Sequence, residues 1–255
     1  MNPWRTAIAQ TDATSIRLRG YDITSLMRQS TFSGTVFLLH QARLPSADEA
    51  RLLDAVLIAV ADHGSGAPSC ATSRLVASGN RQSLSAAVAA GILAIGDEHG
   101  GAGEACMALI GRVVERARQA SISIEDAARA TVDETKAAGT RLPGLGHRQH
   151  TTDPRVDVLF SMAREMNLAG DGISAILAIE AAARERIKPL PMNIDGALAG
   201  VLFDLGFPPP AGKLMFMVGR VAGLTAEIAE EHTREKPMRI RIPVEYDGVP
   251  PREIG

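Results

Sequence analysis

The stretch SADEARLLDAVLIAVADHG, residues 46–64, has the pattern of an amphipathic helix and indicates a helical fold. Ser46 is followed three residues later by Glu49, which is the capping-box pattern that opens a helix. Apolar side chains then recur at positions 52, 53, 56, 57 and 60, the i, i+3, i+4 spacing of one helix face. We therefore predict an amphipathic helix through Val60 that runs directly into the loop Asp62-His63-Gly64.

Helical patterns of this kind cover most of the chain, whereas strand patterns are short. Residues 15–19 alternate in polarity and predict one short strand, and residues 238–246 predict an extended tail. Forty alanines and an aromatic content of only 4% favour helices whose axes approach closely. We predict an all-α fold of about ten helices, at residues 22–27, 32–41, 46–60, 70–78, 83–96, up to 119, from 124, 155–167, 172–187, 193–205 and 213–231.

The composition excludes several classes of protein. The 255 residues are 45% hydrophobic and 22% charged, the balance of a folded globular chain rather than a disordered one. With 27 basic and 29 acidic side chains the formal charge is −2, so no basic field attracts nucleic acid. There is no run of 18 apolar residues, and the two cysteines, Cys70 and Cys106, fit a reducing compartment. We expect a cytoplasmic protein that binds neither nucleic acid nor a membrane.

Three of the six histidines, His63, His99 and His147, adjoin a glycine at the end of a predicted helix. Glycine lets the backbone approach a ligand closely, and histidine titrates nearest to neutral pH. Taken singly, each of them is more often a capping or solvated residue. The sequence lacks the H-E-x-x-H spacing of a zinc site, and His147 and His150 have no carboxylate nearby before Asp153, so no metal is expected.

Three further segments carry candidate binding groups. The loop 142–148 contains Gly144 and Gly146 and precedes Arg155, which lies in the first turn of a predicted helix and could bind a carboxylate. The alternative is a plain surface loop with a helix cap. Asp195 lies at another helix start, where it could be a cap or a functional acid. Arg220 interrupts an apolar helix and predicts a buried anionic partner.

The order of these motifs resembles the citrate synthase superfamily, over nearly the whole chain. The resemblance rests on His63-Gly64, Glu98-His99-Gly100-Gly101-Ala102, Pro143-Gly144-Leu145-Gly146-His147-Arg148 with Asp153-Pro154-Arg155, Asn193-Ile194-Asp195 and Arg220-Val221-Ala222-Gly223-Leu224. It implies an all-α dimer with a large helical domain, residues 1–104 and 206–255, and an inserted small helical domain, residues 105–205. The active site would lie in the cleft between them.

The resemblance also implies a role for individual residues. His99, His147 and Asp195 would be catalytic, and His63, Arg155 and Arg220 would bind the carboxylates of a four-carbon acid. Arg239 and Arg241 are the two candidates for the arginine that reaches the site from the partner subunit, and Arg241 is favoured. Coenzyme A, as a thioester, would contact Leu142, Gly144, Gly146, Lys188 and Asn193. One departure is Glu227, since many relatives carry histidine there.

The chemistry of these residue types agrees with such roles. An acetyl methyl group is a very weak carbon acid, so a carboxylate base needs a hydrogen-bond donor on the thioester oxygen. Only 62 residues precede His63, and this shortness resembles the citryl-CoA lyases and the corresponding module of ATP-citrate lyase. We expect cleavage of citryl-CoA to acetyl-CoA and oxaloacetate. The alternatives are an acyltransferase of the citrate or methylcitrate synthase type, or a non-catalytic acyl-CoA-binding subunit that partners a citryl-CoA synthetase.

Overall fold

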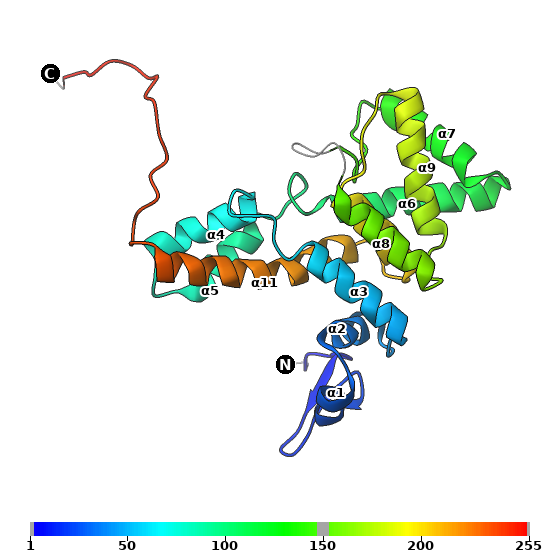
Figure 1. Cartoon of the computed structure of the whole chain (residues 1–255), viewed down its shortest axis with the longest axis horizontal. Coiled ribbons are helices and arrows are strands. Elements are labelled where there is room, and N and C mark those ends of the chain that lie inside the picture. The colour runs from blue at the N-terminus through cyan, green and yellow to red at the C-terminus, as the bar shows by residue number, and fades with distance from the viewer. Residues whose placement is uncertain (1–2, 147–152, 254–255) are drawn as a thin grey trace.

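The fold is all-α, as predicted. The structure, a computed structural model, describes residues 3–146 and 153–253, which contain eleven helices and three short strands (Figure 1). The helices are α1 Ile23–Gln29, α2 Phe32–Gln41, α3 Ala47–Ala59, α4 Pro68–Gly79, α5 Leu84–Leu93, α6 Ala102–Ala120, α7 Ile124–Ala137, α8 Pro154–Glu165, α9 Asp171–Arg186, α10 Ile194–Asp204 and α11 Ala211–Arg234.

Several predicted helix starts are formed by the residues that the sequence indicated, whereas α4 and α11 each begin two residues before the predicted position. Ser46 and Glu49 make both bonds of the capping box at the start of α3. The Ser123 side chain accepts from the Asp126 amide at α7, and Pro154 occupies the first turn of α8. Predicted helix ends are less accurate: α5 ends at Leu93 rather than 96, because residues beyond it form the loop that carries His99.

A small antiparallel sheet precedes the helices and is larger than the sequence predicted. Strands β1 Ala9–Thr11, β2 Ile16–Leu18 and β3 Tyr21–Asp22 pair in the order β1-β2-β3. Only β2 corresponds to the predicted strand. The other two, Ala-Gln-Thr and Tyr-Asp, lack the apolar–polar–apolar alternation that Ile16-Arg17-Leu18 shows. With α1, the sheet lies at one end of the molecule (Figure 1).

Helix α11 is central, and glycines allow its close packing. It packs against α3, α4, α5, α6 and α10. A Cβ added to Gly219 would lie 2.6 Å from the Leu57 carbonyl oxygen, and one added to Gly223 would collide with the Ala61 carbonyl. Gly212 and Gly103 bring α11 equally close to α6. These contacts fix the C-terminal end of α3, and therefore the loop that follows it, against α11.

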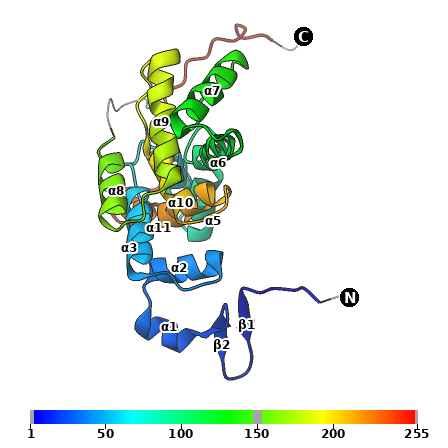
Figure 2. The same cartoon turned by 90° about the vertical axis from the view of Figure 1, so that its right-hand side faces the viewer.

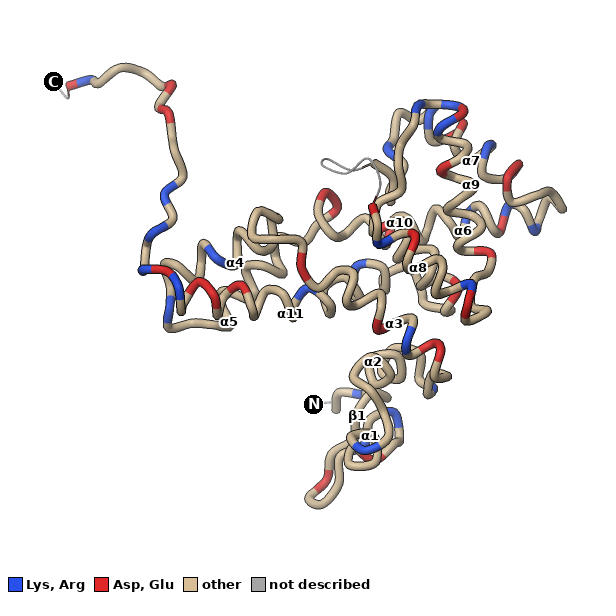
Figure 3. The backbone as a smooth tube through the Cα atoms, viewed as in Figure 1, with Lys and Arg blue, Asp and Glu red and all other residues tan. Residues whose placement is uncertain are grey.

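The other elements lie on either side of this centre. Helices α6 to α10 gather on one side, whereas α4 and α5 lie along the C-terminal half of α11 (Figures 1 and 2). Beyond α11 the chain forms an exposed tail that extends away from the helices (Figure 1). Acidic and basic residues are interspersed along the chain (Figure 3). None of the described helices combines the length and apolar character needed to cross a bilayer.

Replacing Gly219 with alanine tests the close packing of α11. The added methyl group would meet backbone rather than a movable side chain, so we expect Gly219→Ala to lower the free energy of unfolding by about 1–3 kcal/mol. Gly111→Ala in α6 is the matched control, because its Cβ would have an ordinary 3.7 Å contact with Phe203. That change should stabilise the helix by about 0.5–1 kcal/mol. Equal urea unfolding midpoints for the two variants would contradict the packing.

Candidate active site

A cavity of about 1000 Å³ opens where the predicted motifs meet. The residues that line it come from the loop between α3 and α4, the loop before α6, the loop between α7 and α8, the first turns of α4, α6, α8 and α10, and one face of α11. Nine residues predicted to form the site are among them: His63, His99, Leu142, Gly144, Gly146, Arg155, Asn193, Asp195 and Arg220. Segments far apart in the sequence therefore converge on one cavity.

Three predicted site residues are not placed there. Lys188 and Arg241 are both exposed and do not line the cavity. Lys188 follows the end of α9, and Arg241 lies in the tail. His147, together with its neighbour His150, lies outside the described residues. The roles of all three in the site stay predictions.

Asp195 is half-buried at the first turn of α10, and it does not cap the helix. The cap is Asn193, whose side-chain oxygen accepts from the amides of Asp195 at 3.0 Å and Gly196 at 3.2 Å. Within the described chain, Oδ1 of Asp195 is buried without a hydrogen-bond partner. An unsatisfied buried carboxylate oxygen is costly, so the interpretation of Asp195 as a simple cap is wrong.

The electrostatic surroundings give this carboxyl an unusual proton affinity. Burial raises the pKa of Asp195 from 3.8 to about 6, although the positive charges of Arg155 and Arg220 act in the opposite direction. The nearby Asp153 charge adds to the increase. A carboxyl with a pKa near 6 can both accept and release a proton close to neutral pH.

The glycines of the loop between α7 and α8 permit close contact with the start of α10. Gly144 has a positive φ of 81°, and a Cβ there would lie 2.7 Å from the Gly196 Cα. Asn193 holds the loop twice, because its amide donates to the Gly144 carbonyl at 3.1 Å and its side chain donates to the Gly146 carbonyl at 2.7 Å. Asn193 therefore joins this loop to the helix that carries Asp195.

His99 is oriented by the first turn of α4. The backbone amide of Ser69 donates to Nε2 of His99 at 3.2 Å, and the Ser69 hydroxyl lies 3.0 Å from the same nitrogen. Since an amide can only donate, Nε2 is the acceptor, and the proton of the neutral ring is on Nδ1. His99 thus has a defined N–H donor. No sequence pattern indicated Ser69, which lies thirty residues away from the histidine.

Arg220 is 1% exposed and ties three helices together. Its Nε donates to the Val60 carbonyl at 2.8 Å, one terminal nitrogen donates to the Ser69 hydroxyl at 3.1 Å, and the guanidinium lies 4.9 Å from the centre of the Phe216 ring. Among the described residues no carboxylate forms an ion pair with it. A buried cation without a counter-charge is unfavourable, so the site is suited to an anionic ligand.

Arg155, by contrast, already has an acidic partner. It makes a bidentate ion pair with the buried Asp153, in which Nε and one terminal nitrogen donate to the two carboxylate oxygens at 2.9 and 2.6 Å. Its other terminal nitrogen donates to the Ala59 carbonyl at 2.9 Å. These contacts use three of its five N–H donors. Sequence reasoning identified Arg155 but missed this pairing, for which the adjacent Asp-Pro-Arg sequence is the available signal.

One group of side chains has the geometry of a metal site. The ligand atoms of Asp62, Cys70 and Glu227 lie within 4.8 Å of one another. Glu227, however, is already ion-paired with Arg74 at 2.5 Å. Burial, together with the charge of Asp62, raises the pKa of the Cys70 thiol, so it stays protonated at neutral pH. This arrangement favours an ion-pair network over a metal site.

An all-α protein whose cavity combines a buried proton-exchanging carboxyl, a histidine N–H donor and a buried guanidinium has the groups required to handle a carbanion and an anionic acid. Comparison with known proteins assigns the family. The family model described as "Citrate synthase, C-terminal domain" matches residues 45–241. The chain belongs to the citrate synthase family.

Individual relatives differ in what they are named for. Citryl-CoA lyase from Hydrogenobacter thermophilus has a TM-score of 0.89 and 35% identity, covering 100% of this chain and 98% of that one. Citrate synthase 1 of Mycobacterium tuberculosis is 30% identical over 71% of this chain and 43% of its own length, and Citrate/2-methylcitrate synthase of Bacillus subtilis is 28% identical over 83% and 55%. The chain thus spans about half the length of these curated relatives.

A more distant structure supports the fold alone. ATP citrate lyase from Methanothrix soehngenii, solved in complex with citrate and coenzyme A, has a TM-score of 0.75 at 21% identity, covering 97% of this chain and 42% of that one.

The raised pKa of Asp195 predicts how stability depends on pH. Because the folded protein holds this proton more tightly than the unfolded chain, ionised Asp195 opposes folding at pH 7, and the penalty fades as the pH falls from about 6 towards 4. Relative to Asp195→Asn, the wild type should therefore lose about 2 kcal/mol of unfolding free energy between pH 4 and pH 7. Urea unfolding at several pH values measures this difference.

The control is Asp171→Asn, which changes an exposed aspartate in the first turn of α9. The difference in unfolding free energy between Asp171→Asn and the wild type should stay nearly the same from pH 4 to pH 7. If the unfolding free energies of Asp195→Asn and the wild type change in parallel with pH, the pKa of Asp195 is not raised.

Proposed function

We propose that this protein is a citryl-CoA lyase, which cleaves citryl-CoA to acetyl-CoA and oxaloacetate by a retro-Claisen reaction. The observation that carries the proposal is the buried, unpartnered Oδ1 of Asp195, in a carboxyl with a pKa of about 6, within the cavity that also contains His99. The full-length likeness to a citryl-CoA lyase at 35% identity favours cleavage over synthesis.

Binding of the four-carbon part would use the cationic groups of the cavity. Arg220 offers a desolvated positive charge to one carboxylate, and Arg155 offers the N–H donors that Asp153 and Ala59 do not use. His63 lines the cavity from the loop after α3. A ligand with several carboxylates would supply the acidic partner that no described residue supplies to Arg220.

The cleavage assigns one task to each catalytic residue. His147, predicted from the sequence alone, takes the proton from the citryl hydroxyl as that oxygen becomes the carbonyl of oxaloacetate. The electron pair of the breaking carbon–carbon bond passes to the thioester, giving the acetyl-CoA enolate. The Nδ1–H of His99 donates to the enolate oxygen, and protonated Asp195 gives its proton to the methylene carbon. Acetyl-CoA results, and Asp195 is left ionised.

The coenzyme A portion would lie along the loop that contains Leu142, Gly144 and Gly146. Leu142 and Gly144 are buried, and the carbonyls of Gly144 and Gly146 accept from Asn193, so the loop has a fixed backbone beside the cavity. Lys188 is exposed in the segment between α9 and α10, which pairs with this loop at Leu145 and Met192, and it would attract the phosphates of the ligand. No metal takes part in the proposed reaction.

Two observations support a homodimer with the predicted domain division, residues 1–104 and 206–255 for the large domain and residues 105–205 for the inserted one. The cavity is lined from both parts. The tail exposes apolar side chains away from its own helices, namely Ile242, Val244 and Tyr246 at 68%, 86% and 75%. A second copy of the chain could cover these side chains, and Arg241 of the tail could then reach the cavity of that copy. Arg239 is already paired with Glu231 of its own chain.

A synthase of the citrate or methylcitrate type is the second candidate, favoured by the relatives at 28–30% identity. The same groups serve both directions, but a synthase must also hydrolyse the thioester. A non-catalytic subunit that binds acyl-CoA beside a citryl-CoA synthetase is the third candidate. It would bind coenzyme A without any turnover.

Replacing Asp195 tests the proposed chemistry. We expect purified protein to form oxaloacetate from citryl-CoA, followed by coupled reduction to malate, and Asp195→Asn to lower kcat at least about 1000-fold because the carbon is no longer protonated. Asp171→Asn is the matched control and should keep the wild-type rate, since that aspartate lies exposed in the first turn of α9.

Two results would contradict this proposal. Thiol release from acetyl-CoA and oxaloacetate, without cleavage of citryl-CoA, would identify a synthase. Binding of coenzyme A with no turnover in either direction would identify the non-catalytic subunit.

A further inference from the structure

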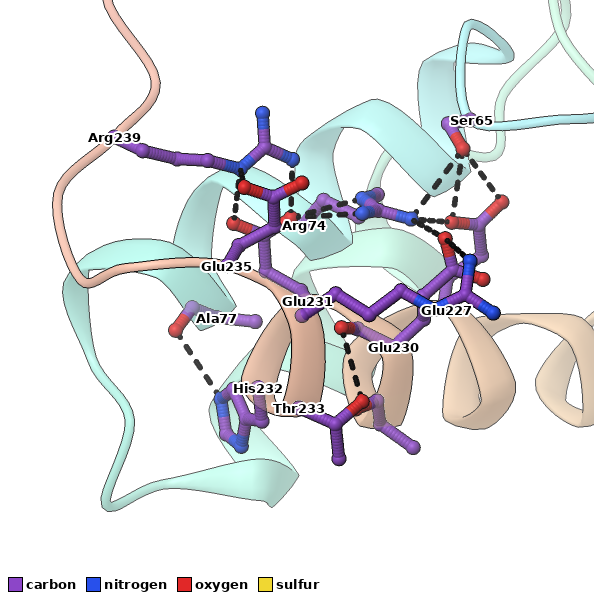
Figure 4. Close-up of polar contacts among 12 residues, drawn as sticks. Ser65, Arg74, Ala77, Glu227, Glu230, Glu231, His232, Thr233, Glu235 and Arg239 are labelled. Atoms are coloured by element: carbon purple, nitrogen blue, oxygen red, sulfur yellow. Dashed lines mark hydrogen bonds and ion pairs between the residues drawn. The ribbon is translucent and has the colours of Figure 1, made fainter.

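A continuous set of polar contacts connects the root of the C-terminal tail with the loop that carries His63. It runs from Arg239 through Glu231, Arg74 and Glu227 to Ser65 (Figure 4). The two glutamates lie on α11, Arg74 lies on α4, and Ser65 lies in the loop between α3 and α4. None of the residues in this set lines the cavity.

The centre of the set is a buried ion pair. Glu231 is fully buried, and it accepts from Nε of Arg74 at 3.0 Å and from Arg239 at 3.0 and 2.5 Å. Burial alone would raise the pKa of Glu231, but the hydrogen bonds and charges of Arg239 and Arg74 outweigh it, so the pKa is lowered. Glu231 therefore stays ionised and holds Arg74 in one orientation.

Arg74 in turn directs Glu227 towards the loop. The two groups form an ion pair at 2.5 Å, with side-chain exposures of 9% for Arg74 and 11% for Glu227. Both carboxylate oxygens of Glu227 accept from the Ser65 hydroxyl, at 3.1 and 3.0 Å. Partial burial makes this contact stronger than a surface ion pair.

The loop itself offers little packing that could hold it in place. Gly64 has a positive φ of 84°, and a Cβ added at either Gly64 or Gly66 would meet nothing within 4 Å. The Gly64 amide donates to Asp62 within the loop, and the Ala67 amide donates to the Gly64 carbonyl. The bond from Ser65 to Glu227 is therefore a side-chain tether between this sparsely packed segment and α11.

We propose that Glu227 is a positioning residue that fixes the His63 loop for recognition of the acid substrate. It acts through Ser65, and Arg74 and Glu231 hold it in place. The departure from histidine at this position thus has a structural use. The identity of the bound acid rests on the function proposed above, whereas the positioning of His63 does not.

A double-mutant cycle separates positioning from a general structural effect. Calorimetry would measure oxaloacetate binding to the wild type, Glu227→Ala, His63→Ala and the double variant, with coenzyme A binding measured in parallel. Glu227→Ala should weaken oxaloacetate binding about tenfold and leave coenzyme A binding unchanged. The loss should disappear in the His63→Ala background, because Glu227 acts through that residue.

Two further variants provide controls. Glu230→Gln changes the neighbouring, 44% exposed glutamate, which lies 3.6 Å from Arg74, and should bind oxaloacetate like the wild type. If Glu227→Ala does not fold, Ser65→Ala breaks the same tether from the exposed loop and should show the same tenfold loss.

A second readout needs no ligand. In protein labelled with ¹³C-histidine, the His63 imidazole signal, assigned by its loss in His63→Ala, should shift towards that of a free histidine in Glu227→Ala but not in Glu230→Gln. An unchanged His63 signal, or an equal loss of oxaloacetate binding in both His63 backgrounds, would overturn the positioning role. Failure of the wild type to bind oxaloacetate would instead refute the proposed function, and the histidine signal would still decide the positioning role.

Discussion

The buried guanidinium of Arg220 is the constraint on which the rest of the site depends. It projects from α11, binds the last carbonyl before the His63 loop and binds the hydroxyl of Ser69. Ser69 in turn fixes the Nε2 face of His99. One side chain therefore sets the relative positions of α3, α4 and α11. The close packing that glycines allow along α11 makes this contact possible.

The same charge links structure to chemistry. Arg220 and Arg155 both act to lower the pKa of Asp195, but burial is stronger, and the pKa settles near 6. The cavity thus contains a carboxyl that exchanges protons near neutral pH beside a buried cation with no acidic partner among the described residues. An acid with several carboxylates would neutralise that cation. In the proposed reaction, recognition of the acid and proton transfer to carbon would therefore depend on the same electrostatic balance.

The sequence was sufficient for the helices and for most residues of the cavity. Capping patterns such as Ser46 with Glu49 and Ser123 with Asp126 depend on neighbouring residues, which is why they could be recognised. The end of α5, two short strands and the contact between Ser69 and His99 depend on tertiary packing, which spacing does not encode. The cap at Asn193 and the ion pair of Asp153 with Arg155 involve residues close in sequence. Even so, only the geometry decided whether Asp195 is a helix cap or a residue of the site.

The proposed chemistry requires Asp195 to move a proton to and from the methyl carbon of acetyl-CoA, whichever direction of reaction dominates. The most direct measurement is exchange of the acetyl-CoA methyl protons in D₂O, with malate occupying the site of the four-carbon acid, followed by proton NMR. The wild type should replace the methyl protons with deuterium, and Asp195→Asn should not. Equal exchange rates for the two proteins would contradict the account.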